Sequence, residues 1–332
     1  MLVSKSYGNA YSFSSIDNKL DFDAVELEIS NLKKVIGEFS NSKNNNIEFS
    51  TDYYDLSVST QSLENNLLDI TNDTSATIHL LSEIEKAIGP NKSYLDTPTM
   101  LAQVKANNLQ GFLYEYPYTL KSTWPGIPES SLIYTYRDAC NHNSFNFRNG
   151  LTTPKEFTDK AILTYEHIEF HEEFEDRLNT IKRGVFSDYL SEFSHALNTL
   201  NQAYFDISKD GNQNANDLIK IQNISRHKNL QGRELACTQQ AKNKPFFNFP
   251  NLQIKNTRNL PNGTKVLEHP IESVNCEFHL KLNFNDQNIK LPDDYNRAYF
   301  GLKYCDITKR KYIKIAYIGE HWPPKKGGKK RK

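Results

Sequence analysis

The sequence predicts an α+β protein, with a mainly helical, acidic N-terminal part followed by a small, basic, antiparallel β-rich module. Three observations lead to this prediction. Apolar residues recur at helical spacing through the first two thirds of the chain. Alternation of apolar and polar residues, typical of half-buried strands, is clearest near the C-terminal end. The charges are also divided unequally between these parts, although the 332-residue chain is formally neutral.

The charge division predicts an anionic partner for the basic part. Residues 1–219 contain 17 Lys and Arg against 31 Asp and Glu, a net charge of −14. Residues 220–332 contain 23 against 9, a net charge of +14. Such an asymmetry favours binding to a nucleic acid or a membrane surface. We expect no membrane association, because no run approaches the roughly 20 apolar residues of a membrane span.

The location predicted from the sequence is the cytoplasm. The first twenty residues are polar and lack the apolar core of a secretion signal. The four cysteines are far apart and form no CxxC pair, which fits a reducing compartment.

Residues 1–150 are predicted to form an N-terminal helical region. Apolar spacing predicts helices at residues 22–39, 63–70, 75–88 and 97–108. Gly89 and Pro90 give a clear stop to the third of these. Residues 47–60 fit either a short strand or a loop. The proline-containing stretch 114–149 is interpreted as a seam between domains.

Residues 151–225 are predicted to form a helical hairpin. Thr152 or Thr153 is a suitable cap, Pro154 suits the first turn, and Glu156 adds a first-turn carboxylate. We expect this helix to run to about residue 182 and to break at Gly184. A second helix follows at 187–205 and a shorter one at 215–225. The short break favours an antiparallel hairpin.

Residues 226–332 are predicted to be a basic β-rich module with a disordered tail. Alternating residues predict strands at 276–284, 298–304 and 312–318, with a turn at 306–309. The last eight residues carry six positive charges, which is typical of a disordered segment.

The polar positions of these strands form the candidate site. Alternation places His279 and Lys281 on one face of the first strand, and Arg297 and Tyr299 on one face of the second; His321 follows the third. If the strands pair, the five side chains converge on one end or face of a sheet. Cleavage of RNA through its 2′-hydroxyl requires a base, an acid and a cation for the phosphate. Histidine suits the first two roles, and arginine and lysine suit the third.

The last two strands also resemble a known family. The segment Arg297-Ala-Tyr-Phe-Gly-Leu-Lys-Tyr304, a turn, and Tyr312-Ile-Lys-Ile-Ala-Tyr-Ile-Gly-Glu-His321 are similar to the last hairpin of the RelE/ParE toxin superfamily. The resemblance implies a small sheet packed on helices, with Arg297, Tyr299 and His321 in the active sheet. RelE-like members are metal-independent ribonucleases, often ribosome-dependent, whereas ParE-like members poison gyrase. This chain is much longer than the usual toxin, and a proline-rich segment replaces the helices that normally precede the sheet.

The function predicted from these residues is a toxin-like or defence-like endoribonuclease, that is, an RNA hydrolase of toxin–antitoxin or antiviral systems. His279 and His321 would be general base and acid, in either order. Arg297 and Lys281 would hold the phosphate, and Tyr299 would position the RNA or stack on a base. No metal or other cofactor is expected. The acidic helices would regulate the site, recruit an antitoxin or another protein, or cover the basic surface.

An alternative of a different class is a non-catalytic nucleic-acid-binding or interaction protein, in which the same residues only contact phosphate. Two groups of residues have some features of metal sites. Cys276 and His279, with Cys305 and His321, could suggest zinc, but a strand would turn Cys276 and His279 to opposite faces. His167 and His171 have the spacing of a helical metal pair without the HExxH pattern, and the surrounding acids favour a solvated helix face.

Overall fold

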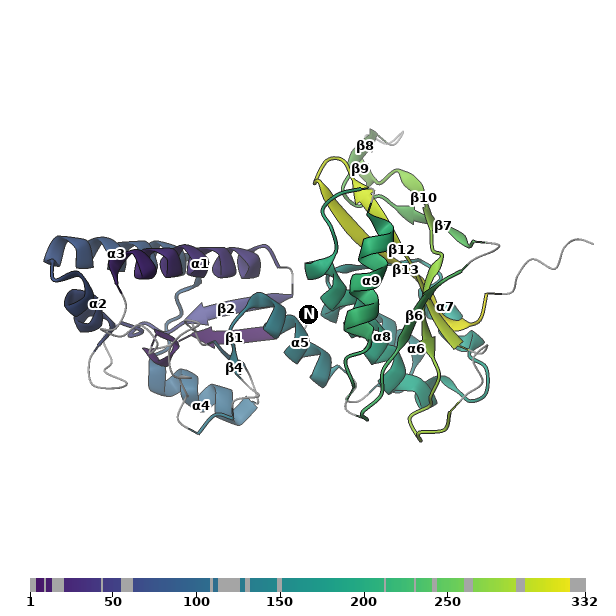
Figure 1. Ribbon diagram of the computed structural model, residues 1–332, viewed down its shortest axis with the longest axis horizontal. Helices are drawn as coiled ribbons and strands as arrows, with labels where there is room; N and C mark the ends of the chain where they lie inside the picture. The colour runs from purple at the N-terminus through teal and green to yellow at the C-terminus, as the bar shows by residue number, and fades with distance from the viewer. Residues whose placement is uncertain are drawn as a thin grey trace, which may run out of the picture. The chain divides into compact units, whose positions relative to one another are not determined.

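A computed structural model of the chain describes residues 4–8, 10–13, 21–42, 44–54, 62–107, 110–112, 126–128, 132–147, 151–211, 213–229, 231–240, 244–259, 265–290 and 296–322. The chain forms two compact units, Met1–Asn143 and Ser144–Lys332 (Figure 1). Helices and sheets occur in both, which confirms the predicted α+β class. The regions predicted at 151–225 and 226–332 both fall inside the second unit. The basic tail lies outside the described residues.

The first unit contains a parallel sheet with the strand order β2-β1-β3-β4. Its strands are β1 (Ser4–Gly8), β2 (Asn45–Phe49), β3 (Gln110–Phe112) and β4 (Leu132–Ile133). Its helices are α1 (Phe22–Ser40), α2 (Leu63–Thr71), α3 (Thr74–Ile88), α4 (Thr97–Asn107) and α5 (Tyr136–Asn146), with short 3-10 turns η1 (Ala10–Phe13) and η2 (Gly89–Asn91). In Figure 1, α1 and α3 run along one side of this sheet and α4 along the other.

The four helices predicted in this unit are confirmed, because their local signals are strong. The side chain of Asp21 accepts a hydrogen bond from the Ala24 amide and caps α1. Val25, Ile29 and Leu32 repeat at helical spacing and are buried. The sequence did not predict this sheet as a whole. Its strands are two to five residues long, which is too short for a clear alternation of apolar and polar residues, and only the ambiguous stretch 47–60 contains part of one of them, β2.

The helices of the second unit are α6 (Pro154–Thr164), α7 (Phe174–Arg177), α8 (Leu190–Asp206) and α9 (Asn214–Ser225), with 3-10 turns η4 (Leu178–Thr180) and η5 (Phe186–Tyr189). The predicted start of α6 is confirmed by a capping box between Thr153 and Glu156. The predicted extension to residue 182 is wrong. Residues beyond Thr164 form β5 (Ile168–Phe170), which pairs in parallel with β13 (Arg310–Glu320). Pairing with a distant strand therefore outweighs the local helical spacing.

A five-stranded sheet with the order β5-β13-β12-β11-β6 is the centre of the second unit. Its further strands are β6 (Ala236–Gln239), β11 (Phe278–Leu282), β12 (Asn296–Cys305) and β13 (Arg310–Glu320). These bounds confirm the three predicted C-terminal strands and the turn between the last two. Two ribbons lie outside this sheet: β7 (Phe246–Pro250) with β10 (Ile271–Asn275), and β8 (Asn256–Asn259) with β9 (Lys265–Glu268).

The two faces of this sheet have different covers. One face joins α6, α8 and α9 in an apolar core, to which the sheet contributes Phe278, Leu280, Leu282, Ala298, Phe300, Leu302, Ile313, Ile315 and Ile318. The opposite face meets the β7–β10 ribbon. The expectation that acidic helices cover the basic polar surface is therefore wrong for α6, α8 and α9, because their apolar sides pack on the apolar face. A fragment starting at residue 226 would lose these helices and most of the buried residues of this core.

Charge attraction within the second unit takes the form of buried ion pairs. Lys311 on β13 lies 2.6 Å from Asp217 on α9, and both side chains are almost inaccessible. Lys314 on β13 bonds Glu169 of β5 and lies 2.9 Å from Glu272 of β10. Removing one partner of such a pair leaves a buried charge and is strongly destabilising. These pairs fix α9, β5 and β10 around β13.

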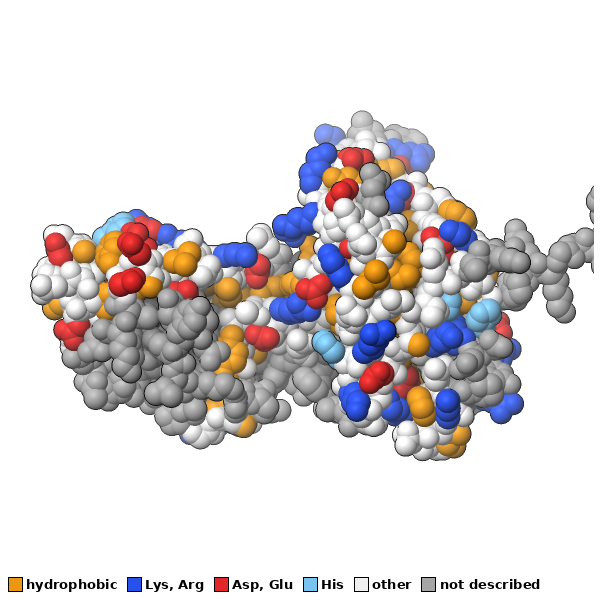
Figure 2. All heavy atoms as spheres, viewed as in Figure 1, with side chains coloured by type: hydrophobic (Ala, Val, Ile, Leu, Met, Phe, Trp, Pro, Cys, Tyr) orange, Lys and Arg blue, Asp and Glu red, His pale blue; other side chains and the backbone are white. Residues whose placement is uncertain are grey.

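The charge difference persists between the two units in a weaker form. The first unit contains 10 Lys and Arg against 18 Asp and Glu, and the second contains 30 against 22. Lys and Arg side chains are spread over the face of the second unit that Figure 2 shows. Among the described residues, the helices lack the length and apolar character that crossing a membrane requires.

The crossing of β10 over β12 depends on Gly301. A Cβ at this position would lie 2.5 Å from the Asn275 carbonyl oxygen and 2.7 Å from Val274 Cγ1. Backbone atoms of β10 cannot move away without disturbing the ribbon. We predict that Gly301→Ala lowers the free energy of unfolding by about 1–3 kcal/mol, measured by urea denaturation. Gly37→Ala is the control, because a Cβ there meets nothing within 4 Å. Equal stability of Gly301→Ala and wild type would contradict the crossing.

Candidate functional site

Strand register brings four of the five predicted site residues together. In the antiparallel pair β11–β12, His279 lies opposite Tyr299, and Lys281 lies opposite Arg297. The ring centroids of His279 and Tyr299 are 5.1 Å apart. All four side chains project from the face opposite the helices, because their neighbours in both strands belong to the apolar core. The sequence-based expectation that they share one face is therefore met by the register.

His321 joins them from beyond the end of β13. Its ring centroid lies 6.5 Å from that of His279 and 6.4 Å from that of Tyr299. The chain turns back over the sheet here, because the amide of Trp322 donates a hydrogen bond of 3.1 Å to the Tyr299 hydroxyl. The cluster of His279, Lys281, Arg297, Tyr299 and His321 is called the histidine–arginine cluster below.

A β-bulge in β13 is the reason that His321 reaches this face. The register passes from Tyr299 opposite Tyr317 to Phe300 opposite Ile315, so Ala316 is an extra residue. A bulge of one residue exchanges the faces of all residues that follow it. Ile315 and Ile318 consequently both point into the helical core, whereas Ala316 and Tyr317 both lie on the opposite side.

Burial sets the protonation states within the cluster. His279 is 5% exposed, Arg297 is 2% exposed and Tyr299 is inaccessible. Burial, followed by the positive charges of Arg297 and His321, lowers the pKa of His279 to about 4. Burial likewise raises the pKa of the Tyr299 hydroxyl. At neutral pH the cluster therefore contains a neutral imidazole at His279 and a neutral phenol at Tyr299, beside the cations Arg297 and Lys281.

Thr238 is a site residue that the sequence did not reveal. It lies opposite His279 in the β11–β6 pair, and its hydroxyl is 2.7 Å from His279 Nε2. This hydrogen bond fixes the orientation of the imidazole and engages Nε2. Residues 236–239 lie outside the hairpin that resembles the toxin family, and four residues gave too weak a strand signal to pair them with β11.

An aromatic cluster beside these residues was also missed. Phe247, Phe249, Tyr317 and Trp322 lie between the sheet and the β7–β10 ribbon, together with Val274 and Cys276. The Trp322 ring lies 5.4 Å from Phe247 and 6.1 Å from Tyr317, between centroids. The available signal was the run of three phenylalanines at 246–249, which indicates burial but not the partner.

The zinc alternative does not fit the surroundings of Cys276. This residue is inaccessible within the aromatic cluster, and burial raises the pKa of its thiol far above its usual value. Zinc binds the thiolate, which such an environment disfavours. The side chain is part of the core, as expected from its place in the strand pattern.

The interpretation of residues 167–171 as a solvated helix face is wrong. These residues form or flank the strand β5, and four residues of a strand span about 13 Å. The His167 ring stacks on Tyr204 of α8 at 4.1 Å, whereas His171 lies between Phe247 and Phe249. Glu169 bonds the buried Lys314. The helical metal pair therefore does not form.

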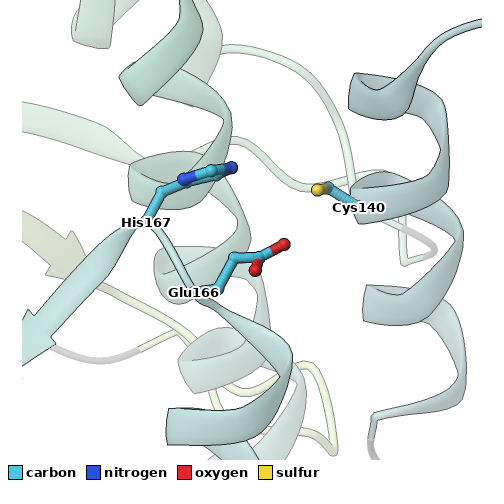
Figure 3. Close-up of side chains that lie close together, drawn as sticks. All are labelled: Cys140, Glu166 and His167. Carbon is cyan, nitrogen blue, oxygen red and sulfur yellow. The ribbon is translucent and has the colours of Figure 1, made fainter. Parts of the chain in front are cut away.

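Figure 3 shows Glu166 and His167 where the chain passes from α6 to β5. It also labels Cys140, which belongs to α5 of the first unit. Burial lowers the pKa of His167 to about 4.

Comparison with family models, with curated proteins and with solved structures finds no match for this chain.

The buried state of His279 predicts a specific pH dependence of stability. A histidine whose pKa is lowered by folding stabilises the protein above the unfolded value of about 6.5, and this stability is lost as the pH falls towards 4. We predict that the wild type loses up to about 3 kcal/mol more unfolding free energy over this interval than His279→Gln.

Urea denaturation at several pH values measures this difference. His167 titrates in the same interval in both proteins, so the comparison isolates His279. The exposed His227 gives the control variant His227→Gln. Parallel stability profiles of wild type and His279→Gln would contradict the buried, neutral state of His279.

Proposed function

We propose that the second unit is a toxin-like or defence-like endoribonuclease that cleaves RNA without a metal at the histidine–arginine cluster. The observation that supports this proposal most strongly is the gathering of two histidines, a tyrosine, an arginine and a lysine from β11, β12 and the end of β13. These groups are sufficient for phosphodiester transfer through a 2′-hydroxyl. The similarity of the β12–β13 hairpin to RelE/ParE toxins points in the same direction.

The protonation states suggest how the roles are divided. His279 has a pKa of about 4, so it is neutral at pH 7 and can accept a proton. Thr238 engages its Nε2, and its Nδ1 is buried, so RNA would have to displace the cover of the imidazole before His279 could accept the proton of the 2′-hydroxyl. His321 is partly accessible and is the proton donor for the leaving 5′-oxygen. The two rings are close enough to act on opposite sides of one phosphate group.

The two cationic side chains differ in accessibility and would therefore act on the phosphate in different ways. Lys281 is partly accessible and would contact the phosphate directly. Arg297 is almost inaccessible and donates to the Asn296 carbonyl oxygen, so it would act mainly through its charge. A charge acts more strongly across a low-dielectric interior than across water. Tyr299 would position His279 and the Trp322 backbone, since an inaccessible ring cannot stack on a base.

The second candidate function is RNA binding without cleavage. The low exposure of His279 favours it, because a general base must touch the proton that it removes. In that case Lys281, His321 and the basic surface would hold RNA, and His279 would be structural. The effects of His321 variants on RNA cleavage and on RNA affinity distinguish a ribonuclease from a protein that only binds RNA.

Several wider expectations belong to this proposal. The protein would act in the cytoplasm as part of a toxin–antitoxin or antiviral defence system. The acidic first unit would regulate the second or bind an antitoxin or another protein partner. If the protein leaves RNA intact, inhibition of gyrase, the activity of ParE-like toxins, is the next activity to test.

Replacement of His321 tests the catalytic role. We predict that His321→Ala lowers RNA cleavage in EDTA by about 10²–10⁴-fold, the usual contribution of a general acid, with an unchanged melting temperature. Cleavage would be assayed on RNA with and without added ribosomes. His227→Ala, an exposed histidine of the same unit, should retain full activity. Full activity of a folded His321→Ala protein would remove His321 from the mechanism.

Deletion of residues 325–332 tests the electrostatic part of the proposal. These eight residues carry six positive charges. We predict weaker RNA binding and a flatter dependence of log Kd on log salt, because fewer condensed counterions are released. Fluorescence anisotropy over a series of salt concentrations measures both quantities. The same salt slope in the truncated and full chains would show that the tail does not contact RNA.

A further inference from the structure

A cleavage site for RNA also needs a surface that holds the bases, and Tyr299 cannot supply it. Its ring is inaccessible and lies between two other rings, with centroid distances of 5.1 Å to both His279 and Tyr317. An incoming base would have to displace one of these neighbours. The stacking role expected for Tyr299 from the sequence is therefore wrong.

Trp322 has the properties that Tyr299 lacks. It directly follows His321 and remains partly accessible. Its position is fixed at two points. The backbone amide donates to the Tyr299 hydroxyl at 3.1 Å, and the indole packs on Phe247 and Tyr317. A ring held in this way loses little conformational freedom when a second ring stacks on its accessible part.

The surroundings of Trp322 also favour a nucleotide. The guanidinium of Arg177 lies over the ring of Tyr317, 5.7 Å from its centroid. Lys281 and His321 lie in the histidine–arginine cluster on the same face of the sheet. Aromatic rings combined with cationic side chains are the usual means by which proteins hold single-stranded nucleic acids.

We propose that Trp322 forms a nucleobase subsite, in which the base next to the phosphate bound by the histidine–arginine cluster stacks on the indole. This inference rests on the proposed function and specifies its substrate. A base within a duplex already stacks on both neighbours, so the subsite selects an unpaired base. The substrate class is therefore single-stranded RNA or a loop.

The intrinsic fluorescence of Trp322 provides a test that does not depend on cleavage. The chain contains two tryptophans, and Trp124 is the other. In a Trp124→Phe protein, Trp322 is the only indole. A fluorescein-labelled, single-stranded 2′-O-methyl RNA of about ten nucleotides lacks the nucleophile and cannot be cleaved through it. Anisotropy reports binding of this oligonucleotide, and an unlabelled copy reports quenching of Trp322.

The expected result is saturable quenching with the same Kd as the anisotropy change, and weaker binding of a fully paired hairpin. Stacking on an aromatic side chain contributes about 1–3 kcal/mol per base, so Trp322→Leu should weaken binding by about 5- to 150-fold. Trp322→Phe keeps a smaller aromatic ring and should lose less. Circular dichroism and thermal unfolding establish that each variant is folded.

The outcomes separate this inference from the proposed function. Binding without quenching, with equal affinity for Trp322→Leu and wild type, would overturn the subsite and leave the ribonuclease proposal intact. Equal losses of RNA affinity in Trp322→Phe and Trp322→Leu would show that Trp322 contributes only to packing, which would also overturn the subsite. Absence of any binding by the wild-type chain, to this RNA and to cleavable RNA, would overturn both. If Trp322→Leu does not fold, the quenching measurement on Trp124→Phe decides.

Discussion

The candidate site of the second unit depends on the extra residue in β13. Ile313 and Ile315 point into the helical core, and strict alternation would send Tyr317, Gly319 and His321 to the same side. The bulge at Ala316 reverses this order, so Ile318 keeps the core contact and His321 turns to the face of His279 and Arg297. Because of the bulge, β13 contributes apolar residues to the helical core and is followed by a histidine on the opposite face. Removing it would exchange apolar and polar residues between the two faces.

The face selected by the bulge is not an open sheet surface. The β7–β10 ribbon and its aromatic residues cover one part, and buried ion pairs of Lys311 and Lys314 fix the strand on which the site depends. The histidine–arginine cluster occupies another part of this face, where the chain turns at His321 and the Trp322 amide bonds Tyr299. This cover accounts for the neutral state of His279, since desolvation disfavours its protonated form. Water would likewise be largely excluded from a phosphate bound there.

The sequence predicted those parts of the second unit that depend on neighbours along the chain. Alternation within β11 and β12 was sufficient to place His279 with Lys281 and Arg297 with Tyr299, and the short turn was sufficient to pair β12 with β13. The bulge, the pairing of Thr238 with His279 and the cover over Tyr299 depend on contacts between distant segments. No local pattern specifies them, so the sequence did not reveal that the ring of Tyr299 is inaccessible.

The same limit explains the errors in the helices and in the first unit. Phe170, Phe174 and Leu178 have helical spacing, yet the first is the last residue of β5, and the others lie in the short α7 and η4 on the core. The parallel sheet of the first unit consists of short strands that are stabilised by mutual pairing and by helices on both sides. Long amphipathic helices with capping residues, such as α1 and α3, were predicted well because their signals are local.

The proposed ribonuclease activity is tested most directly by the chemistry of the RNA ends that it would produce. Attack by the 2′-hydroxyl breaks the bond from phosphorus to the 5′-oxygen and leaves a 2′,3′-cyclic phosphate and a 5′-hydroxyl. Cleavage at the histidine–arginine cluster should give these ends in EDTA, and no cleavage should occur where a 2′-O-methyl group replaces the hydroxyl at the cleaved position. Mass spectrometry of the products of a short defined RNA identifies them. Products with a 5′-phosphate and a 3′-hydroxyl, or RNA that stays intact under all conditions, would contradict the account.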